Sequence, residues 1–309
     1  MKAKPSNLIK NAPLSDYTTF RLGGPCKGLI QCETPEELIE AVKDLAASNK
    51  DFILIGGGSN LVVSDDGLDC YVIRYFSESP RIAEDENTLT VSGSTILDDL
   101  VVFAAEIGLS GINTCSGIPG TVGGAVVGNA GAFGKQIGDV LVSARLLEKD
   151  GALTEVGASE LEFSYRHSSL KETHDIVVDA TLKLDEAETA DLLKEREEIL
   201  KTRADKHPDL SKEPCAGSFF RNIEPTSKAG RRQAAGWFLD QAGGKKLKSG
   251  GAYIYDKHAN IIIKGKNASA KDVFDLSNQM AALAKKEFNL DLVREVRFVG
   301  KIDGAGTNQ

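Results

Sequence analysis

The sequence contains no run of about 18 apolar residues, the length that a membrane-spanning helix requires. Residues 1–10 also lack the apolar stretch that marks a secretory signal peptide. These two absences predict a cytoplasmic protein with no membrane insertion.

Cysteine and histidine are few and stand in no recognisable pairing. The five cysteines are odd in number and include no CxxC pair, and the four histidines form no HExxH motif. A disulfide framework needs paired cysteines, and a structural zinc site needs closely spaced cysteine or histidine ligands. We therefore expect free thiols and no metal site.

The composition is that of an acidic globular protein. The 309 residues include 37 Lys and Arg against 45 Asp and Glu, a net charge of −8, with 41% hydrophobic and 27% charged residues. A disordered chain would contain fewer apolar residues. An acidic balance disfavours nucleic acid as the main partner. The length predicts two or three compact units.

Periodic patterns predict a chain of mixed helices and strands. Apolar residues at helical spacing predict helices over 35–47, 95–107, 187–203, 227–242 and 269–287. Short apolar runs predict strands over 52–55, 71–74, 88–92, 140–147 and 176–184, and a hairpin of 252–255 with 260–263. The helix at 187–203 is strongly charged, which indicates a solvated face, and we place a domain junction there.

Glycine is the most informative residue type. Ten of the 31 glycines fall between Gly108 and Gly138, where they alternate with apolar residues, so we expect a packed segment rather than a linker. Two loops, 56–60 (GGGSN) and 116–124 (SGIPGTVGG), can expose backbone amides to an anion. In the second loop we expect Pro119 in the first turn of a helix.

The alternative for either glycine loop is a tight turn without a ligand. Residues 56–61 lack the third glycine of the Rossmann fingerprint, and the sequence has no GxxxxGK[ST] motif. Two glycine loops in one α/β region nevertheless favour a nucleotide-like ligand.

A set of short motifs in a fixed order extends over residues 11–300. The motifs lie at 11–14 and 18–24, at 56–60, at 116–134, at 165–168, at Arg203, Lys206 and Pro208, at 216–222, at 258–260 and at 294–300. With these motifs the chain resembles the UDP-N-acetylenolpyruvoylglucosamine reductases, in the shorter form of that family. These are bacterial flavoenzymes of peptidoglycan synthesis.

The resemblance implies an α+β fold in several domains. Two FAD-binding subdomains of the vanillyl-alcohol-oxidase or PCMH type are expected at 1–76 and 77–200, a C-terminal α+β substrate-binding domain at 201–301 and a tail at 302–309. FAD and NADPH are the implied cofactors. The implied cofactor-binding residues are Gly56, Gly57, Gly58, Ser59, Asn60, Ser116, Gly117, Ile118, Pro119, Gly120, Gly123, Gly124, Asn129 and Gly131.

Three residues match the family's catalytic positions. The implied reaction brings a hydride from NADPH through FAD to C3 of the enolpyruvyl ether, and a proton to C2. Charge then develops on the substrate carboxylate, which Arg166 can hold with its planar fork of donors. Ser218 matches the proton donor to C2. Glu295 lies at the second carboxylate-side position, where we expect a protonated carboxyl.

Four further residues match substrate-binding positions. Arg203 and Lys206 suit a diphosphate by their charge, and the amide of Asn222 suits a phosphate or a pyrimidine edge. Tyr165 is expected in the same pocket, with simple packing as the alternative. Arg203 can instead cap the end of its helix.

The chain departs from the family's pattern at 223–225, at 255–256 and at Lys264, so secondary contacts near the substrate differ. Cys215 is either a small apolar filler or a reactive thiol, and His258 is either structural or a minor substrate contact. We expect a monomer whose partner is a small UDP-sugar enolpyruvyl ether. The alternatives are an FAD-dependent oxidase of another small alcohol and a flavin-free nucleotide-binding module.

Overall fold

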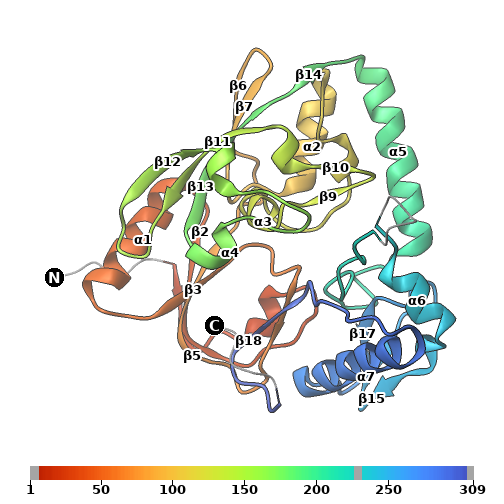
Figure 1. Cartoon of the computed structure of the whole chain (residues 1–309). Coiled ribbons are helices and arrows are strands. Elements are labelled where there is room, and N and C mark those ends of the chain that lie inside the picture. The colour runs from red at the N-terminus through yellow and green to blue at the C-terminus, as the bar shows by residue number, and fades with distance from the viewer. Residues whose placement is uncertain (1–6, 226–231, 305–309) are drawn as a thin grey trace. The chain divides into compact units, whose positions relative to one another are not determined.

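The computed structural model describes residues 7–225 and 232–304 (Figure 1). The chain forms two compact units. Unit 1 comprises the residues up to Asn11, Lys27–Gly57 and Cys70–Arg203, and unit 2 comprises Ala12–Cys26, Gly58–Asp69 and the residues from Ala204 onward. Each unit is therefore built from segments that are distant in the sequence.

The first sheet of unit 1 has four strands and packs against one helix. Its strand order is β1 (Leu8–Ile9), β2 (Cys26–Cys32), β5 (Leu68–Tyr75) and β3 (Phe52–Ile55), with β3 parallel to β5. Helix α1 (Pro35–Ala47) connects β2 to β3. It buries Leu38, Ala41, Val42 and Leu45 in one hydrophobic cluster with residues of β2 and β5. This apolar face, spaced at helical intervals, is the reason why the segment forms a helix against the sheet.

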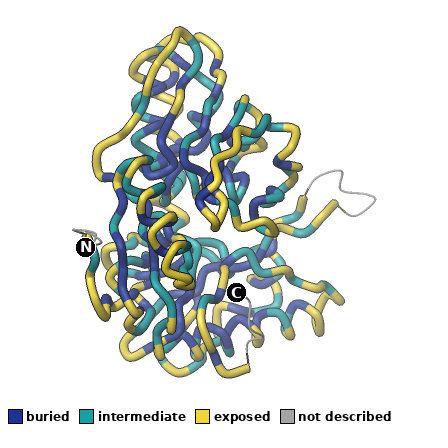
Figure 2. The backbone as a smooth tube through the Cα atoms, turned by 90° about the vertical axis from the view of Figure 1, so that its left-hand side faces the viewer, coloured by how far each residue is buried: buried dark blue, intermediate teal, exposed yellow. Residues whose placement is uncertain are grey.

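The second sheet of unit 1 is antiparallel and carries the glycine-rich region. Its order is β12 (Leu153–Gly157), β11 (Leu141–Leu147), β13 (Ile176–Lys183), β7 (Thr88–Ser92) and β6 (Ile82–Asp85). Helices α2 (Leu97–Glu106) and α3 (Val122–Gly128) bury their apolar residues in one cluster with β7, β11 and β13. Its three central strands, β11, β13 and β7, are mostly buried, whereas the edge strands β12 and β6 are mostly exposed. Figure 2 shows the buried and exposed residues along the backbone.

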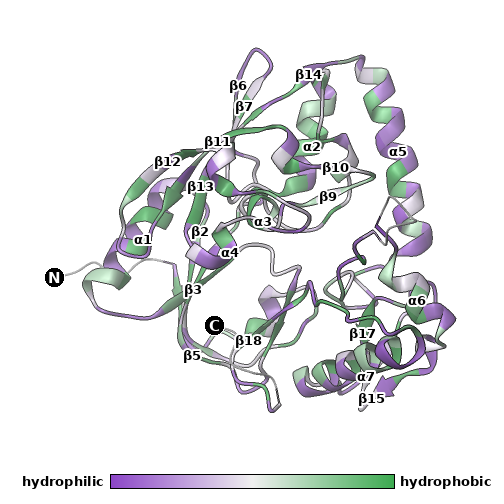
Figure 3. Cartoon of the chain, viewed as in Figure 1, coloured by the Kyte–Doolittle hydropathy of each residue, from purple (hydrophilic) through white to green (hydrophobic). Residues whose placement is uncertain are grey.

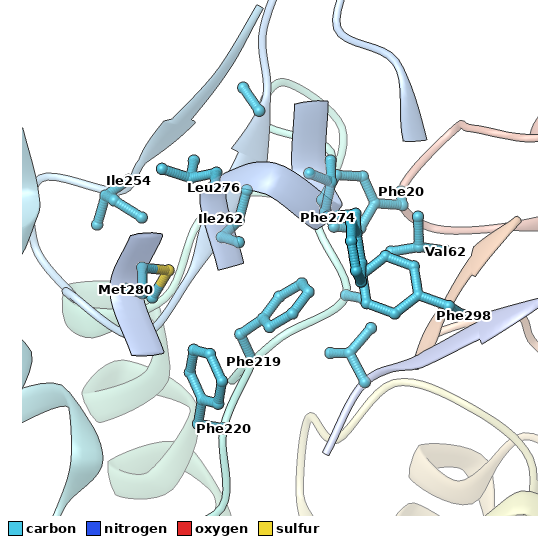
Figure 4. Close-up of a cluster of buried hydrophobic side chains, with 14 of the residues drawn as sticks. Phe20, Val62, Phe219, Phe220, Ile254, Ile262, Phe274, Leu276, Met280 and Phe298 are labelled. Carbon is cyan, nitrogen blue, oxygen red and sulfur yellow. The ribbon is translucent and has the colours of Figure 1, made fainter. Parts of the chain in front are cut away.

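Unit 2 is organised around an aromatic core. Its elements are β4 (Leu61–Val63), β18 (Arg297–Val299), β15 (Lys248–Ser249), β16 (Ala252–Ile254), β17 (Ile262–Lys264), α6 (Ala235–Gln241) and α7 (Ala270–Phe288). Strand β18 pairs in parallel with β4, so an early and a late segment of the chain share one small sheet. Phe219 contacts Phe220 and Phe298 at ring-centroid distances of 5.6 and 5.9 Å (Figure 4). Phe20 and Val62, which come early in the sequence, lie in the same cluster.

The remaining elements of the described part of the chain are short, apart from the long helix α5. These are the strands β8 (Leu109–Ser110), β9 (Gly131–Ala132), β10 (Lys135–Gln136) and β14 (Asp185–Glu186), the helices α4 (Leu170–Thr173) and α5 (Thr189–Lys206), and the 3-10 turns Leu14–Tyr17, Asn113–Cys115, Ile137–Asp139, Ala158–Leu161 and Gly244–Lys246. The charged helix α5 is coloured hydrophilic over most of its length in Figure 3.

Most elements predicted from periodicity are confirmed within a few residues, including the β16–β17 hairpin. The helix predicted over 227–242 is wrong in its first part. Residues 226–231 lie outside the described residues, 232–234 are not helical, and α6 begins only at Ala235. Gln233 instead pairs with Ile223 as an isolated bridge, and this pairing replaces the first helical turn.

Among the described residues, no helix is both long enough and apolar enough to cross a membrane.

We expect Thr34→Ala to lower the free energy of unfolding by about 1 kcal/mol, because an N-cap hydroxyl satisfies an amide that otherwise loses its partner. Thr34 accepts from the amide of Glu37 at 3.2 Å, and Glu37 accepts in return from the amide of Thr34. Urea unfolding measures the change. Thr34→Ser keeps the cap and should stay near the original stability; an equal loss in both variants would contradict the capping role.

Candidate active site

The two glycine loops predicted from the sequence meet in unit 1. A Cβ placed on Gly57 would lie 3.1 Å from the Cα of Gly120, and one placed on Gly56 would lie 2.4 Å from Oγ1 of Thr121. The backbones can approach this closely only because no side chain stands between them. Positions 56 and 57 therefore require glycine, because any side chain there would collide with the loop at 120–121.

A third segment, which the sequence analysis did not single out, holds the second loop in place. The amide of Gly123 donates to the carbonyl of Gly93 at 3.0 Å, and that of Val122 donates to the carbonyl of Thr95 at 2.9 Å. Gly93 must itself be a glycine, since a Cβ there would lie 2.3 Å from the carbonyl oxygen of Val177. The signal in the sequence was weak: one glycine between two serines, directly after a strand.

The prediction that Pro119 lies in the first turn of a helix is wrong. Helix α3 begins at Val122, and Thr121 is its N-cap, with Oγ1 accepting from the amide of Gly124 at 3.4 Å. Pro119 lies before the cap and is exposed. A threonine cap explains the start of the helix better than the proline, because the threonine hydroxyl satisfies an amide of the first turn.

The turn that carries Arg166 is tight and strained. Ser164 and His167 exchange two backbone hydrogen bonds of 3.1 Å, and Arg166 between them has φ of 56°, which is unusual for a residue with a side chain. Asn129 ties this turn to the end of α3: its Nδ2 donates to the carbonyl of Ser164 at 2.8 Å and its Oδ1 accepts from Gly138. The structure thus gives buried Asn129 a positioning role, and its cofactor contact stays a prediction.

Arg166 and Arg203 lie close enough for their charges to affect each other and the thiol of Cys115. Burial lowers the pKa of Arg203, and repulsion from Arg166 adds to this shift. Burial raises the pKa of the thiol of Cys115 to about 11, against the lowering effect of the two guanidinium charges. The buried Nε of Arg203 has no hydrogen-bond partner within the described residues. Two nearby cations with a spare donor are suited to bind an anion.

In unit 2, the structure brings Ser218 and Glu295 onto adjacent segments. The amide of Glu295 donates to the carbonyl of Phe219 at 2.9 Å. Nδ2 of Asn60 donates to the carbonyl of Glu295 at 3.1 Å, so Asn60 also positions this residue. The left-handed Gly217, with φ of 71°, turns the chain directly before Ser218.

Asn260 is the positioning residue that the sequence analysis did not assign, although it belongs to one of the quoted motifs. Its side chain donates to the carbonyl of Phe220 at 2.8 Å and accepts from the amide of Phe220 at 3.0 Å. Its carbonyl accepts from the amide of Phe219 at 2.8 Å. With only 1% of its surface exposed, Asn260 replaces a strand partner for the segment that follows Ser218.

The remaining predicted residues divide between the two units. Gly58, Ser59, Asn60, Lys206, Ser218, Asn222 and Glu295 belong to unit 2, and Gly56, Gly57, Ser116, Gly117, Ile118, Pro119, Gly120, Gly123, Gly124, Asn129, Gly131, Tyr165, Arg166 and Arg203 belong to unit 1. Oδ1 of Asn222 accepts from the amide of Ala235 at the start of α6 at 3.3 Å. The Arg166 guanidinium lies 5.6 Å from the ring centroid of Tyr165. These substrate-binding and catalytic roles stay predictions.

His258 and Cys215, whose roles the sequence left open, lie in unit 2. Burial lowers the pKa of His258, and the charges of Lys206 and Lys245 lower it further. Its Nδ1 accepts from the amide of Asn260 at 3.3 Å, so this nitrogen carries no proton; whether the ring also contacts substrate stays a prediction. Burial raises the pKa of the Cys215 thiol, as expected for an apolar filler.

The glycine region of unit 1 fits the phosphate-bearing part of FAD. Segments 56–57, 93–95 and 120–124 come together largely as backbone, and glycine at Gly57, Gly93 and Gly123 is what permits it. The amides of Val122, Gly123 and Gly124 donate within unit 1. The amides of segment 56–57 and of Gly120 are therefore the ones that can form a concave site for an anion.

Comparisons with known proteins agree with this fit. A family model described as an FAD binding domain matches residues 26–157, and one described as the C-terminal domain of UDP-N-acetylenolpyruvoylglucosamine reductase matches residues 208–299. The reductase of Clostridium botulinum (strain Eklund 17B / Type B) is 34% identical over 298 residues, which cover 96% of this chain and 95% of the relative. The reductase of Bacillus subtilis (strain 168) is 34% identical over 298 residues, with coverages of 95% and 94%.

A solved structure matches as well. The crystal structure of the reductase from Thermus caldophilus is 34% identical, with a TM-score of 0.76, and covers 93% of this chain and 97% of that chain.

The glycine cradle and the matching FAD-binding domain define this protein as an FAD-containing oxidoreductase. The chain belongs to the UDP-N-acetylenolpyruvoylglucosamine reductase family, whose similarity extends over nearly its whole length. The predicted fold class, an α+β chain with an FAD-binding part and a C-terminal substrate domain, is confirmed. FAD and NADPH, the cofactors that this family uses, are confirmed with it.

We expect Asn260→Ala to lower the free energy of unfolding by about 2–6 kcal/mol, because each of two buried polar groups left without a partner costs about 1–3 kcal/mol. Both backbone groups of Phe220 lose their partner in this variant. Chemical denaturation measures the loss. Gln279→Ala removes an exposed amide from α7 and serves as the control; equal effects in the two variants would contradict the assignment.

Proposed function

We propose that this protein reduces UDP-N-acetylglucosamine enolpyruvate to UDP-N-acetylmuramate with NADPH, in the synthesis of peptidoglycan precursors. The family relationship supports the reaction. The observation that carries the residue assignments is the hydrogen bond between Glu295 and Phe219, which joins the segments of two predicted catalytic residues.

FAD, when bound, supplies the hydride carrier between NADPH and C3 of the enolpyruvyl group. The protein must then stabilise negative charge on the substrate carboxylate and supply a proton at C2. These two requirements define what the side chains have to do.

Arg166 holds the substrate carboxylate in this proposal. Its guanidinium presents donors in a fixed plane, which match the two carboxylate oxygens. The strained turn at φ of 56° keeps this residue in one backbone conformation. Strain that the surrounding hydrogen bonds maintain is typical of functional positions.

Ser218 gives its proton to C2, and Glu295 acts beside it as a protonated carboxyl. Support comes from the adjacent segments that carry them and from Asn260, which fixes the backbone on the C-terminal side of Ser218. A hydroxyl is a weak acid, so its orientation must be well defined before the carbon becomes basic.

Arg203 and Lys206 bind the diphosphate of the substrate, and Asn222 binds the uridine end. The spare Nε of Arg203 supports the first assignment, and the charges of Lys206 and Lys245 both act on His258 in unit 2. We further propose a cytoplasmic monomer without a nucleic-acid partner. For the domain organisation we propose FAD-binding subdomains at 1–76 and 77–200, a substrate-binding domain at 201–301 and a tail at 302–309.

We expect Ser218→Ala to separate the two half-reactions. NADPH should still bleach the flavin absorbance, while the UDP-enolpyruvyl sugar should reoxidise the flavin about 10²–10⁴-fold more slowly, the usual contribution of a proton donor. Stopped-flow absorbance in the visible range measures both steps. Ser211→Ala, at an exposed serine of unit 2, is the control. Normal reoxidation in Ser218→Ala would remove the serine from the proposed chemistry.

We expect Arg166→Ala to lower kcat/KM about 10²–10³-fold, the usual cost of removing one stabilising donor from developing charge. Bound flavin per protein should remain unchanged. Arg166→Lys should recover only a small part of the activity, because an ammonium lacks the planar fork. Steady-state kinetics and flavin absorbance measure the two quantities, with Arg81→Ala at an exposed position as the control. Loss of flavin in Arg166→Ala would instead assign the residue to the cofactor site.

A further inference from the structure

An ion pair in unit 1 connects the second glycine loop to helix α5. Asp98, in the first turn of α2, accepts from the amide of Gly117 at 2.7 Å. The same carboxylate accepts from both terminal nitrogens of Arg196 at 2.6 and 2.7 Å. One side chain thus joins a predicted cofactor-binding residue to the helix that carries Arg203.

The pair is well shielded and its geometry is bidentate. The side chains of Arg196 and Asp98 are 15% and 31% exposed. Burial alone would raise the pKa of Asp98, but the hydrogen bonds from Arg196 and Gly117 outweigh it and lower the pKa. The carboxylate therefore stays charged at neutral pH, and charge-assisted bonds of this kind are stronger than neutral ones.

Helix α5 also packs directly on Gly117. With φ of 69°, Gly117 holds a left-handed conformation, and a Cβ there would lie 2.8 Å from Cδ2 of Leu200 and 3.1 Å from Cδ of Arg203. The stem of Arg203 thus lies on the glycine whose amide Asp98 holds. A shift of this loop must displace Arg203.

A second contact joins the same loop to α5 at Glu195, the residue next to Arg196. Nδ2 of Asn113 donates to Oε2 of Glu195 on α5. Asn113 also accepts from the amide of Gly111 at 3.1 Å and, through its carbonyl, from Oγ of Ser116 at 2.6 Å. The loop from Gly111 to Gly117 is therefore bound to α5 at two places.

We propose that Asp98 and Arg196 are positioning residues that couple the FAD-binding loop at Gly117 to the substrate-binding Arg203. The role of Arg203 in this coupling rests on the proposed function. The effect of Asp98 and Arg196 on FAD affinity does not depend on the reaction. Ordering of the loop by FAD fixes Arg203 on Gly117, and an anion that fixes Arg203 orders the loop. By thermodynamic linkage, each ligand then strengthens the other by the same factor.

The cofactor side is tested on apoprotein. Asp98→Asn removes the charge but keeps the shape, and we expect FAD to bind about 10–100-fold more weakly, as for the loss of a hydrogen bond to a charged group. Titration followed by flavin fluorescence measures this without any turnover. Asp99→Asn, at the next residue of the same helical turn, changes the net charge equally and should bind FAD like the original protein.

The substrate side is tested on FAD-saturated protein with UDP as the probe. Asp98→Asn should bind UDP several-fold more weakly than the original protein. Arg196→Lys keeps the charge but loses the fork, and should fall between the original protein and Arg196→Gln in both affinities. Thermal unfolding of each apoprotein checks that the variants remain folded.

Unchanged FAD affinity in Asp98→Asn and Arg196→Gln would overturn the proposal, and so would an equal loss in Asp99→Asn. A loss of FAD affinity with unchanged UDP affinity would overturn the coupling to Arg203. These outcomes are distinct from a failure of the proposed reaction, which the half-reactions of Ser218→Ala report separately.

Discussion

The close approach of bare backbone in unit 1 is the constraint on which the cofactor site depends. The loops that contain Gly57 and Gly120 contact each other at a distance that any side chain would prevent, and Gly93 supports them from β7. Such contacts cost backbone entropy, because glycine loses more freedom on folding than any other residue. The protein offsets this cost with the hydrophobic cluster beneath, where α2 and α3 pack against the second sheet.

The segments that carry Ser218 and Glu295, the predicted catalytic residues of unit 2, depend on polar groups that replace regular secondary structure. Ser218 and Glu295 lie outside the regular strands and helices, and the segment that carries Ser218 is paired only by isolated bridges, Ser218 with Ile261 and Phe220 with Arg294. Buried Asn260 satisfies both backbone groups of Phe220, and the amide of Glu295 satisfies the carbonyl of Phe219. Buried backbone groups must find partners. In this region those partners also determine where the reactive side chains lie.

In unit 1, polar and charged partners likewise fix the segments that carry two predicted site residues. Arg166 occupies a turn that Asn129 ties to α3, and Arg203 rests on the loop that Asp98 and Arg196 hold. Cationic side chains that bind an anion gain affinity when their positions are fixed before binding, because less side-chain entropy is lost in the complex. The polar framework around the two arginines therefore fixes the segments that carry them before any anion binds.

The sequence by itself determined the local elements and the chemistry of the residues. The capping box of α1, the strand at 52–55, the hairpin of β16 with β17 and the glycine loops all follow from short-range patterns, and these patterns are set by contacts between near neighbours. Family motifs supplied Ser218, Arg166 and Glu295. Only the tertiary structure decided which loops meet, that Gly93 supports them, and that Asn260, Asp98 and Arg196 position other residues. A hydrogen bond between residues 98 and 196, or between 219 and 295, produces no recognisable pattern in the sequence, because its partners are far apart along the chain. Folding alone brings such partners together.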